Sequence, residues 1–354
     1  MKREHVRYLA CPVCSESFEL RPSVEDSLGI CSGELTCVRC GSTYPIVRYI
    51  PRFVPERNYA SSFGFQWTKH SRTQHDSYTG VPISEERFFR ETRWPRRLDG
   101  EVILEVGCGS GRFTAPAATT GATLVSMDYS VAVDANYAAN GRRPNVLVVQ
   151  ADLYQMPFLP ASFDRVFCFG VLQHTPNVEK SFLSLAKMVR PSGCLAIDVY
   201  RKLPVFKRLF LTKYLIRPFT RRISPKLLYR ITRAYVTMMW PIARLIHRIP
   251  RFGPLINWRL FVIDYRDVFP LSESLLREWA ILDAFDMLSP AFDSPQTLET
   301  VQRWFQKVGF ANVEVHQGYN GIEGRGARLP DGRNDRARLG DSATPQAEKG
   351  QCGY

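Results

Sequence analysis

A glycine turn at residues 107–111 is the first feature of the sequence that can do chemistry. Gly107, Gly109 and Gly111 follow the apolar run "EVILEV", and a turn of this kind lets backbone amides approach a bound ligand closely. A dinucleotide fingerprint, G-x-G-x-x-G, needs its third glycine at position 112. That position is Arg112. The turn therefore predicts a nucleotide-like ligand, without the spacing that dinucleotide binding requires.

Three acidic residues accompany the turn at the ends of apolar runs. Glu105 lies in "EVILEV", Asp128 ends "LVSMD" and Asp152 follows "NVLVVQA". The spacing of Asp128 suits a carboxylate that binds two ribose hydroxyls, and Asp152 can accept a hydrogen bond from an adenine amino group. We expect all three at the carboxyl edge of one sheet, where open α/β proteins bind ligands.

The elements that position these residues alternate along residues 101–200. The runs "EVILEV", "ATLVSMD", "NVLVVQAD", "DRVFCFG" and "GCLAIDVY" have the length and β-branched content of strands, and helix-length segments separate them. This alternation predicts βαβ units and an α/β, doubly wound, mostly parallel sheet. "QTLETVQRWFQKV" and "ANVEVHQG" add a last helix and strand.

Five motifs in order resemble the class I S-adenosylmethionine-dependent methyltransferases, in particular the group that includes the ubiquinone and menaquinone biosynthesis enzymes. The motifs are "LEVGCGSGRF", "LVSMDYS", "VQADLYQMPF", "FDRVFCFGVLQHTPN" and "LAKMVRPSGCLAIDVY". The match covers about residues 95–200, and 290–318 more loosely. The resemblance implies a Rossmann-like, seven-stranded sheet and S-adenosylmethionine as cofactor. The alternative is a doubly wound fold that has lost its ligand.

The resemblance also implies which residues contact the cofactor. Asp128 would bind the ribose hydroxyls with Tyr129 beside the adenine, and the backbone around Phe169 would lie near the sulfonium. The full set is Glu105, Gly107, Gly109, Gly111, Asp128, Tyr129, Asp152, Leu153 and Phe169. Phe65 and Trp67 can close over the cofactor, or simply pack.

Methyl transfer needs a general base only when the nucleophile must lose a proton. His174, in "VLQHTPN", is the candidate catalytic residue, and the alternative is a histidine that only shapes the loop. Asp283 and Asp286 lie in the apolar stretch "EWAILDAFDML". They can contact substrate or pair with arginines of the preceding segment.

Four cysteines form two C-x-x-C pairs in residues 1–56. Cys11 and Cys14 are separated from Cys37 and Cys40 by 22 residues, and four thiolates make a closed tetrahedral site of the structural zinc type. The following "GSTYPIVRYIPRF" resembles the zinc-ribbon-like domains that activate, or are fused to, methyltransferases. We expect structural Zn²⁺; the alternative is a ribbon that holds its shape without metal.

The positive charge of the chain is concentrated in one segment. The formal net charge is +13, and residues 201–260 hold 15 Lys or Arg and no Asp or Glu. Basic residues recur there at helical spacing beside apolar ones, which is typical of a helix on an anionic membrane surface. The alternatives are a cap with solvated arginines and an RNA-binding surface. RNA is less favoured, because "FGVLQH" lacks the Asp/Asn-Pro-Pro-aromatic motif of base amino-methyltransferases.

These observations divide the chain into six segments. We expect a zinc ribbon at 1–56, a linker with cofactor-covering helices at 57–100, the methyltransferase core at 101–200, a basic helical insert or substrate cap at 201–290, the final helix and strand at 291–319 and a disordered tail at 320–354. Prolines 218 and 241, among others, should cut the insert into short helices. The oligomeric state is not predicted.

The predicted activity is methyl transfer to oxygen or carbon of a small-molecule, lipid-linked or glycan-linked acceptor. The alternatives are an RNA methyltransferase and a non-catalytic scaffold that the cofactor stabilises. "MKREHVRYLACPVC" lacks the apolar core of a signal peptide, and the longest uncharged stretch of the basic segment, 234–243, is about half of a membrane span. We therefore expect a cytoplasmic protein that can associate with the membrane from that side.

Overall fold

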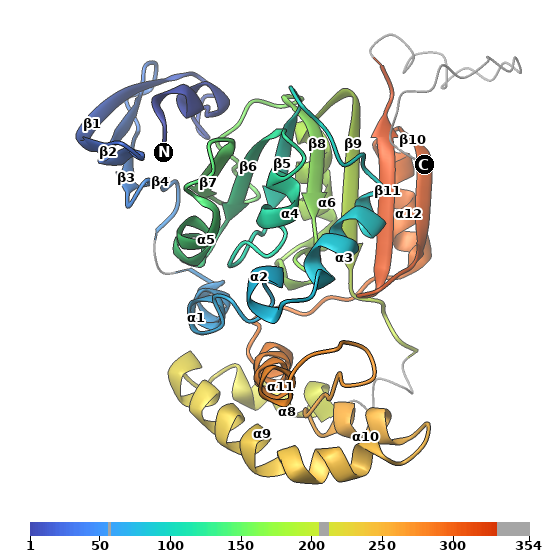
Figure 1. Ribbon diagram of the computed structural model, residues 1–354. Coiled ribbons are helices and arrows are strands. Elements are labelled where there is room, and N and C mark those ends of the chain that lie inside the picture. Colours follow the sequence, from blue (N-terminus) through green and yellow to red (C-terminus); the bar gives the residue numbers. More distant parts are fainter. Residues whose placement is uncertain (56–57, 205–211, 331–354) are drawn as a thin grey trace, which may run out of the picture.

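The computed structural model describes residues 1–55, 58–204 and 212–330. Figure 1 shows three parts: a small antiparallel sheet at the N-terminus, a central sheet covered by helices, and a helical cap below the edge of that sheet. The expected boundary near residue 56 and parts of the basic insert (205–211) and the tail (331–354) lie outside the described residues.

The central sheet has seven strands in the order β10-β11-β9-β8-β5-β6-β7. The five strands from β9 to β7 run parallel, and β11 runs antiparallel to both of its neighbours. The predicted Rossmann-like, mostly parallel sheet is therefore confirmed. The strands are β5 (Val102–Val106), β6 (Thr123–Asp128), β7 (Val146–Gln150), β8 (Phe163–Cys168), β9 (Val189–Val199), β10 (Phe310–Gln317) and β11 (Ile322–Arg328).

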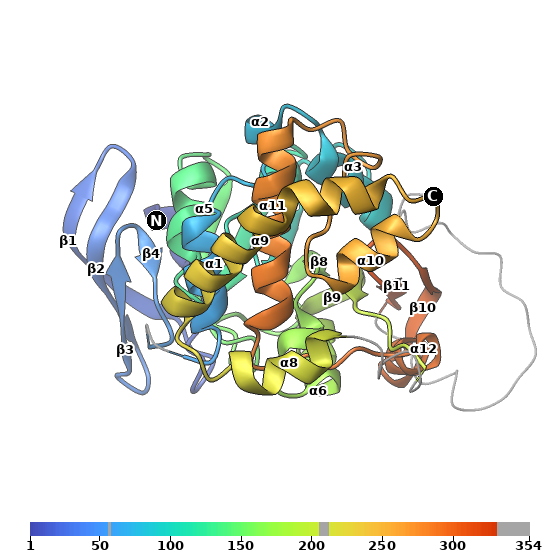
Figure 2. The same cartoon turned by 90° about the horizontal axis from the view of Figure 1, so that it is seen from below.

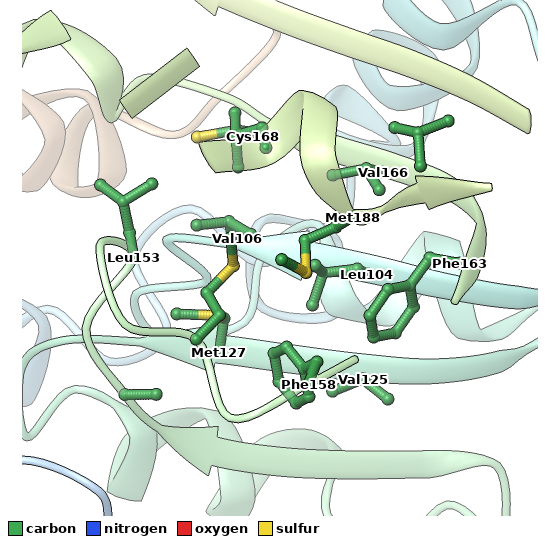
Figure 3. Close-up of a cluster of buried hydrophobic side chains, with 14 of the residues drawn as sticks. Leu104, Val106, Val125, Met127, Leu153, Phe158, Phe163, Val166, Cys168 and Met188 are labelled. Atoms are coloured by element: carbon green, nitrogen blue, oxygen red, sulfur yellow. The ribbon is translucent and has the colours of Figure 1, made fainter. Parts of the chain in front are cut away.

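Helices cover both faces of this sheet, which explains why its strands are apolar on both sides. In Figure 1, α3 (Ile83–Thr92), α4 (Thr114–Ala118) and α5 (Val133–Asn140) lie in front of the sheet, and α6 (Val178–Met188) and α12 (Leu298–Lys307) lie behind it. Figure 3 shows part of the hydrophobic core of the sheet, where side chains such as Leu104, Val166 and Phe163 pack together.

Strand β11 corrects the predicted boundary of the tail. Residues 320–354 were expected to be disordered, yet Ile322–Arg328 form a strand between β9 and β10. The composition of "IEGRGAR" hides it, because two glycines take the place of apolar residues. A Cβ at Gly324 or Gly326 would lie 2.9 or 3.0 Å from the Phe305 ring, so the packing of α12 on this strand requires glycine.

The cap also differs from expectation in the length of its helices. It consists of α8 (Thr212–Thr220), α9 (Pro225–His247), α10 (Gly253–Arg259) and α11 (Glu273–Leu288). Pro218 and Pro241 lie inside α8 and α9 and do not end them. In α9 the buried side chains of Leu228, Val236 and Trp240 anchor the helix against the cap core, and this burial offsets the hydrogen bond that Pro241 removes.

The N-terminal sheet docks on the free edge of the central sheet. It begins with η1 (Arg3–Tyr8) and contains β1 (Phe18–Asp26), β2 (Gly29–Cys37), β3 (Thr43–Val47) and β4 (Ile50–Pro51). After β4 the Phe53 amide donates to the Gln150 carbonyl of β7 at 2.8 Å, and Arg52 donates to Asp134 of α5 at 2.7 Å. The edge strand β7 is thereby covered.

Candidate active site

A cavity of about 240 Å³ lies between the central sheet and the cap. Its walls come from the carboxyl ends of β5, β6, β8 and β9, from α1 (Ser61–Lys69) and from α11. Figure 1 shows that α1 and α11 lie against this edge of the sheet. The cavity therefore has one wall made by the sheet edge, where ligands of α/β proteins bind, and another made by the cap.

The glycine turn forms part of the first wall. Gly107, Gly109 and Gly111 have φ values of +82°, +52° and +90°, in the left-handed region that favours glycine. A Cβ at Gly109 would lie 3.1 Å from Nε1 of Trp67, which lines the cavity beside it. Gly107 and Gly109 line the cavity, whereas Gly111 packs against Asn136 of α5. The backbone at Gly107 and Gly109 is therefore open to a ligand.

Asp128 places a carboxylate in the same wall, at the end of β6. Its Oδ2 accepts a hydrogen bond from the Gly109 amide at 2.9 Å, and its Oδ1 accepts from the Ser130 amide at 2.8 Å. Burial raises the pKa of Asp128 above its usual value. Tyr129 also lines the cavity, with its ring 4.8 Å from that of Tyr59. The carboxylate and the two rings form a surface suited to a ribose and a flat base.

Two of the predicted acids do not line the cavity. Glu105 is buried behind the turn, where its Oε2 accepts hydrogen bonds from Thr114 and Ser126, each at 2.5 Å. Burial raises its pKa to about 7. Asp152 accepts from the amide of Tyr154 at 2.8 Å and also lies outside the wall. Glu105 thus ties the end of β5 to β6 and α4, and its part in cofactor binding stays a prediction, as does that of Asp152.

Apolar and aromatic side chains line the part of the cavity beside the glycine turn. Leu153 and Phe169, two of the predicted cofactor contacts, line this part of the cavity, and so does Trp67 of α1. Phe65 instead points into the cap core, where its ring contacts those of Tyr229 and Phe285. Of the two aromatic residues that were expected as possible covers, the structure brings only Trp67 to the cavity.

His174 lines the cavity from η2 (Leu172–His174). Its Nδ1 lies 3.0 Å from the carbonyl oxygen of Phe292. The ring lies between those of Phe63 and Tyr200, at centroid distances of 5.0 and 5.4 Å. Burial lowers the pKa of His174, while the charge of Asp286 opposes this shift. The imidazole is therefore fixed in orientation and neutral near pH 7.

Asp283 and Asp286 project from α11 into the cavity. Tyr265 donates a hydrogen bond to Asp283 at 2.7 Å, and Gln66 donates to Asp286 at 3.2 Å. Burial raises the pKa of Asp283 to about 7. In the described part of the chain neither acid forms an ion pair with an arginine of the basic segment. Within the described ranges the structure thus favours the alternative in which both acids face the cavity.

Two arginines of the cavity were not found from the sequence as site residues. Arg112 was singled out only because it is not glycine. It is partly buried in the cavity wall, donates to Gln74 at 2.6 Å and to Ser84 at 3.2 Å, and has no acidic partner within 4.0 Å in the described ranges. Burial lowers its pKa to about 10. Arg112 is thus a cation inside the cavity wall that the described residues do not neutralise.

Arg87 of α3 differs from Arg112 in having two buried acidic partners. It forms ion pairs with Glu91, at 2.5 Å, and with Asp198 of β9. Burial raises the pKa of Glu91 to about 8. Only the folded chain brings these three residues together, since they are separated by up to 111 positions. Arg87 and Glu91 are four residues apart on one helix, which the sequence shows, but no local signal marks Asp198 as their neighbour.

The four cysteines of the N-terminal sheet gather at one point. Their Sγ atoms all lie within 4.8 Å of one another, and the pairs Cys11–Cys40 and Cys14–Cys37 are 3.6 and 3.4 Å apart. Tetrahedral zinc with Zn–S bonds of about 2.3 Å separates its sulfur ligands by about 3.8 Å. Ser42 lowers the pKa of Cys40 to about 6 by hydrogen bonding. The donor set and its spacing fit Zn²⁺.

Comparison with known proteins agrees with this site. Residues 104–197 match the family described as "Methyltransferase domain". The ubiquinone biosynthesis O-methyltransferase of Rhizobium rhizogenes is 33% identical over 116 residues, which is 32% of this chain and 46% of that protein. The sterol 24-C-methyltransferase of Pneumocystis carinii is 29% identical over 103 residues, or 28% and 27% of the two chains.

A solved candidate S-adenosylmethionine-dependent methyltransferase from Methanococcus maripaludis shares 14% identity with this chain. The structural match covers 78% of this chain and 97% of that chain, with a TM-score of 0.42. This likeness is too distant to carry an inference.

The motif, the sheet and the comparisons together define a class I S-adenosylmethionine-dependent methyltransferase domain in this chain. The chain spans about half the length of the curated ubiquinone-biosynthesis relatives that it matches. The matched region therefore does not specify the acceptor.

Proposed function

We propose that this protein transfers a methyl group from S-adenosylmethionine to a hydroxyl oxygen of an acceptor bound between His174 and α11. The observation that carries the proposal is the hydrogen bond of His174. A carbonyl oxygen can only accept, so the contact with Phe292 fixes the proton of the neutral ring on Nδ1. Nε2 of a ring that lines the cavity then keeps its lone pair and can accept a proton.

The neighbours of His174 support this role. The pKa of the buried ring is lowered, so the base form predominates at neutral pH. Asp286 lies close enough to favour the imidazolium that forms when the proton arrives. When bound, S-adenosylmethionine supplies an electrophilic methyl group on a sulfonium. The chain's own part is to hold the acceptor hydroxyl against Nε2 and to exclude water.

The part of the cavity between His174 and α11 is called the acceptor half. Its lining indicates what kind of molecule it takes. Tyr265, Trp279 and Tyr319 give it aromatic walls, and Arg112 adds a positive charge. These groups favour a flat or apolar body that carries an anionic or electron-rich polar group. The O-methyltransferase relatives support oxygen as the acceptor atom.

A transfer assay tests the proposal. The protein is incubated with methyl-labelled S-adenosylmethionine and with separated lipid, small-molecule and RNA fractions of a cell extract. We expect label in the lipid or small-molecule fraction, in a form that hydriodic acid releases, as it does from methyl ethers. Label that resists this cleavage would instead indicate a carbon acceptor, and ribonuclease-sensitive label would indicate RNA. Cofactor binding without any transfer would favour a scaffold.

A further inference from the structure

We propose that the outer face of the cap, formed by the exposed side chains of α8, α9 and α10, docks on an anionic lipid bilayer. This inference rests on the proposed function and deepens it. If the cap docks on a bilayer, the acceptor is an amphiphile that enters the cavity from that bilayer. None of the helices in the described ranges is long and apolar enough to cross a membrane. The contact proposed is therefore with the surface of the bilayer.

Helix α9 carries two apolar stripes on different sides. The buried stripe packs on the cap core and includes Leu228, Thr232, Val236, Trp240 and Ala243. The exposed stripe consists of Leu227, Ile231, Met238, Ile242 and Leu245. Their separations of four, seven, four and three residues keep the exposed side chains on one side of an α-helix. One stripe explains the fold of the cap, and nothing in the described protein covers the other.

The helices that neighbour α9 also carry exposed apolar side chains. Leu215 and Phe219 of α8, Phe252 before α10 and Leu255 within it are exposed. Of 21 large exposed apolar side chains in the described part of the chain, 12 lie between residues 215 and 256. Figure 2, seen from the cap side, shows that α8, α9 and α10 lie together on the side of the molecule away from the sheet. So many exposed apolar side chains in one part of the surface are typical of an interaction site.

The charge of the same face is what selects an anionic bilayer as its partner. Eight exposed basic residues of the cap have no ion pair with the residues that the structure describes: Arg221, Arg222, Lys226, Arg230, Arg233, Arg248, Arg251 and Arg259. Arg230 and Arg233 share one flank of α9, between its buried and exposed stripes, with Arg230 the nearer of the two to the exposed stripe. In a bilayer interface the apolar stripe enters the acyl region while such side chains reach lipid phosphates. RNA would engage the arginines and leave the stripe in water.

The arrangement also connects this face to the cavity. Helix α9 packs on α11, and α11 supplies Trp279, Leu282 and Asp283 to the cavity wall. The connection from α10 to α11 supplies Tyr265. The acceptor half of the cavity is therefore one helix layer away from the proposed membrane contact. A lipid-linked acceptor can bring its polar head to His174 while its tail remains in the bilayer.

Vesicle cosedimentation tests the proposal without any methyl donor. The probes are vesicles of pure phosphatidylcholine and vesicles with 30% phosphatidylglycerol. The first variant is Leu245→Ser/Phe252→Ser, whose side chains are 65% and 63% exposed, so that the fold should tolerate the change. The second is Arg230→Gln/Arg233→Gln. The matched control, Val24→Ser/Leu159→Ser, replaces two exposed apolar residues outside the cap.

We expect the wild type to bind the anionic vesicles far more tightly than the neutral ones. The arginine variant should bind about thirtyfold more weakly at low salt, from about fivefold per lost charge. The apolar variant should lose at least about tenfold, and the control should bind as the wild type does.

Any of four results would overturn the proposal. The first three are no binding to anionic vesicles, an equal loss in the control, and RNA binding that needs the arginines but not Leu245 and Phe252. A wild-type dimer in solution that the apolar variant separates would assign the face to a second copy instead. Because the assay contains no methyl donor, a failure here leaves cofactor binding and methyl transfer to be judged separately.

Discussion

Replacing His174 with asparagine separates its chemical role from its structural one. The amide nitrogen of the introduced side chain would stand near the place of Nδ1, so His174→Asn can keep the hydrogen bond to Phe292, which is 3.0 Å long in the wild type. The variant has no atom in place of Nε2. It therefore removes the proposed base and retains the anchor. A general base contributes about 10²–10⁴-fold to the rate, so kcat should fall by that factor.

The same substitution has a small predicted effect on the fold. It removes ring contacts with Phe63 and Tyr200, which lie 5.0 and 5.4 Å from the imidazole. Loss of a buried ring of this size with its polar anchor kept should cost about 1–2 kcal/mol of unfolding free energy. Affinity for S-adenosylmethionine should stay within about threefold of the wild type, because His174 is not among the predicted contacts of the cofactor. Denaturant titration and calorimetry measure these two quantities.

The pH profile distinguishes a base from a residue that only shapes the pocket. Since burial lowers the pKa of His174 below its usual 6.5, kcat/KM should be level above that pH. It should fall tenfold per unit of pH below the lowered pKa, where the ring becomes protonated. The asparagine variant should lack this acidic limb. Activity within about threefold of the wild type, or an unchanged acidic limb, would refute the assignment of His174 as the base.

Three further predictions concern stability and metal. Arg87→Met leaves Asp198 buried without its cation and should reduce the unfolding free energy by about 3–5 kcal/mol, whereas Arg97→Met, at a side chain that is 85% exposed, should cost under about 1 kcal/mol in the same denaturant titration. Metal analysis should find one zinc per chain, and Cys37→Ser should lower that content and the melting temperature; a metal-free wild type that melts unchanged in a chelator would contradict the ribbon assignment. The raised pKa of Glu105 stabilises the cofactor-free fold below pH 4.5 and loses this contribution as the pH rises to about 7, by about 3 kcal/mol. Glu105→Gln should flatten that part of the stability curve, and an unchanged slope would show that Glu105 ionises without penalty.

The sequence allowed much of the cofactor wall to be predicted because its signals are local. Strand-length apolar runs, the glycine turn and an acid at the end of the next strand all lie within residues 101–128. The cysteine cluster could also be predicted, because C-x-x-C spacing places two thiolates together whatever the tertiary structure. These features needed only the general topology of a parallel sheet to be brought to one edge.

Features that depend on contacts between distant parts of the chain could not be predicted in the same way. In the sequence Arg112 looks like part of the glycine turn, and only the folded chain brings Ser84 of α3 against it. Arg87 contacts Asp198 only in the folded chain. Strand β11 was missed because its glycines make room for the ring of Phe305, and no local sequence pattern shows that this ring packs there. The length of α9 depended on burial against the cap core, which outweighs the presence of Pro241. Tertiary packing decides each of these features.

The central claim is that this cavity binds S-adenosylmethionine through the carboxylate of Asp128. Isothermal calorimetry with the cofactor alone tests it most directly, with Asp128→Ala as the variant and Asp99→Ala, at an exposed acid, as the control. Loss of charge-assisted hydrogen bonds to the ribose should weaken binding by about 10–100-fold, while the control should bind as the wild type does. A wild type that releases no heat, or an Asp128→Ala protein that stays folded and binds equally well, would contradict the account.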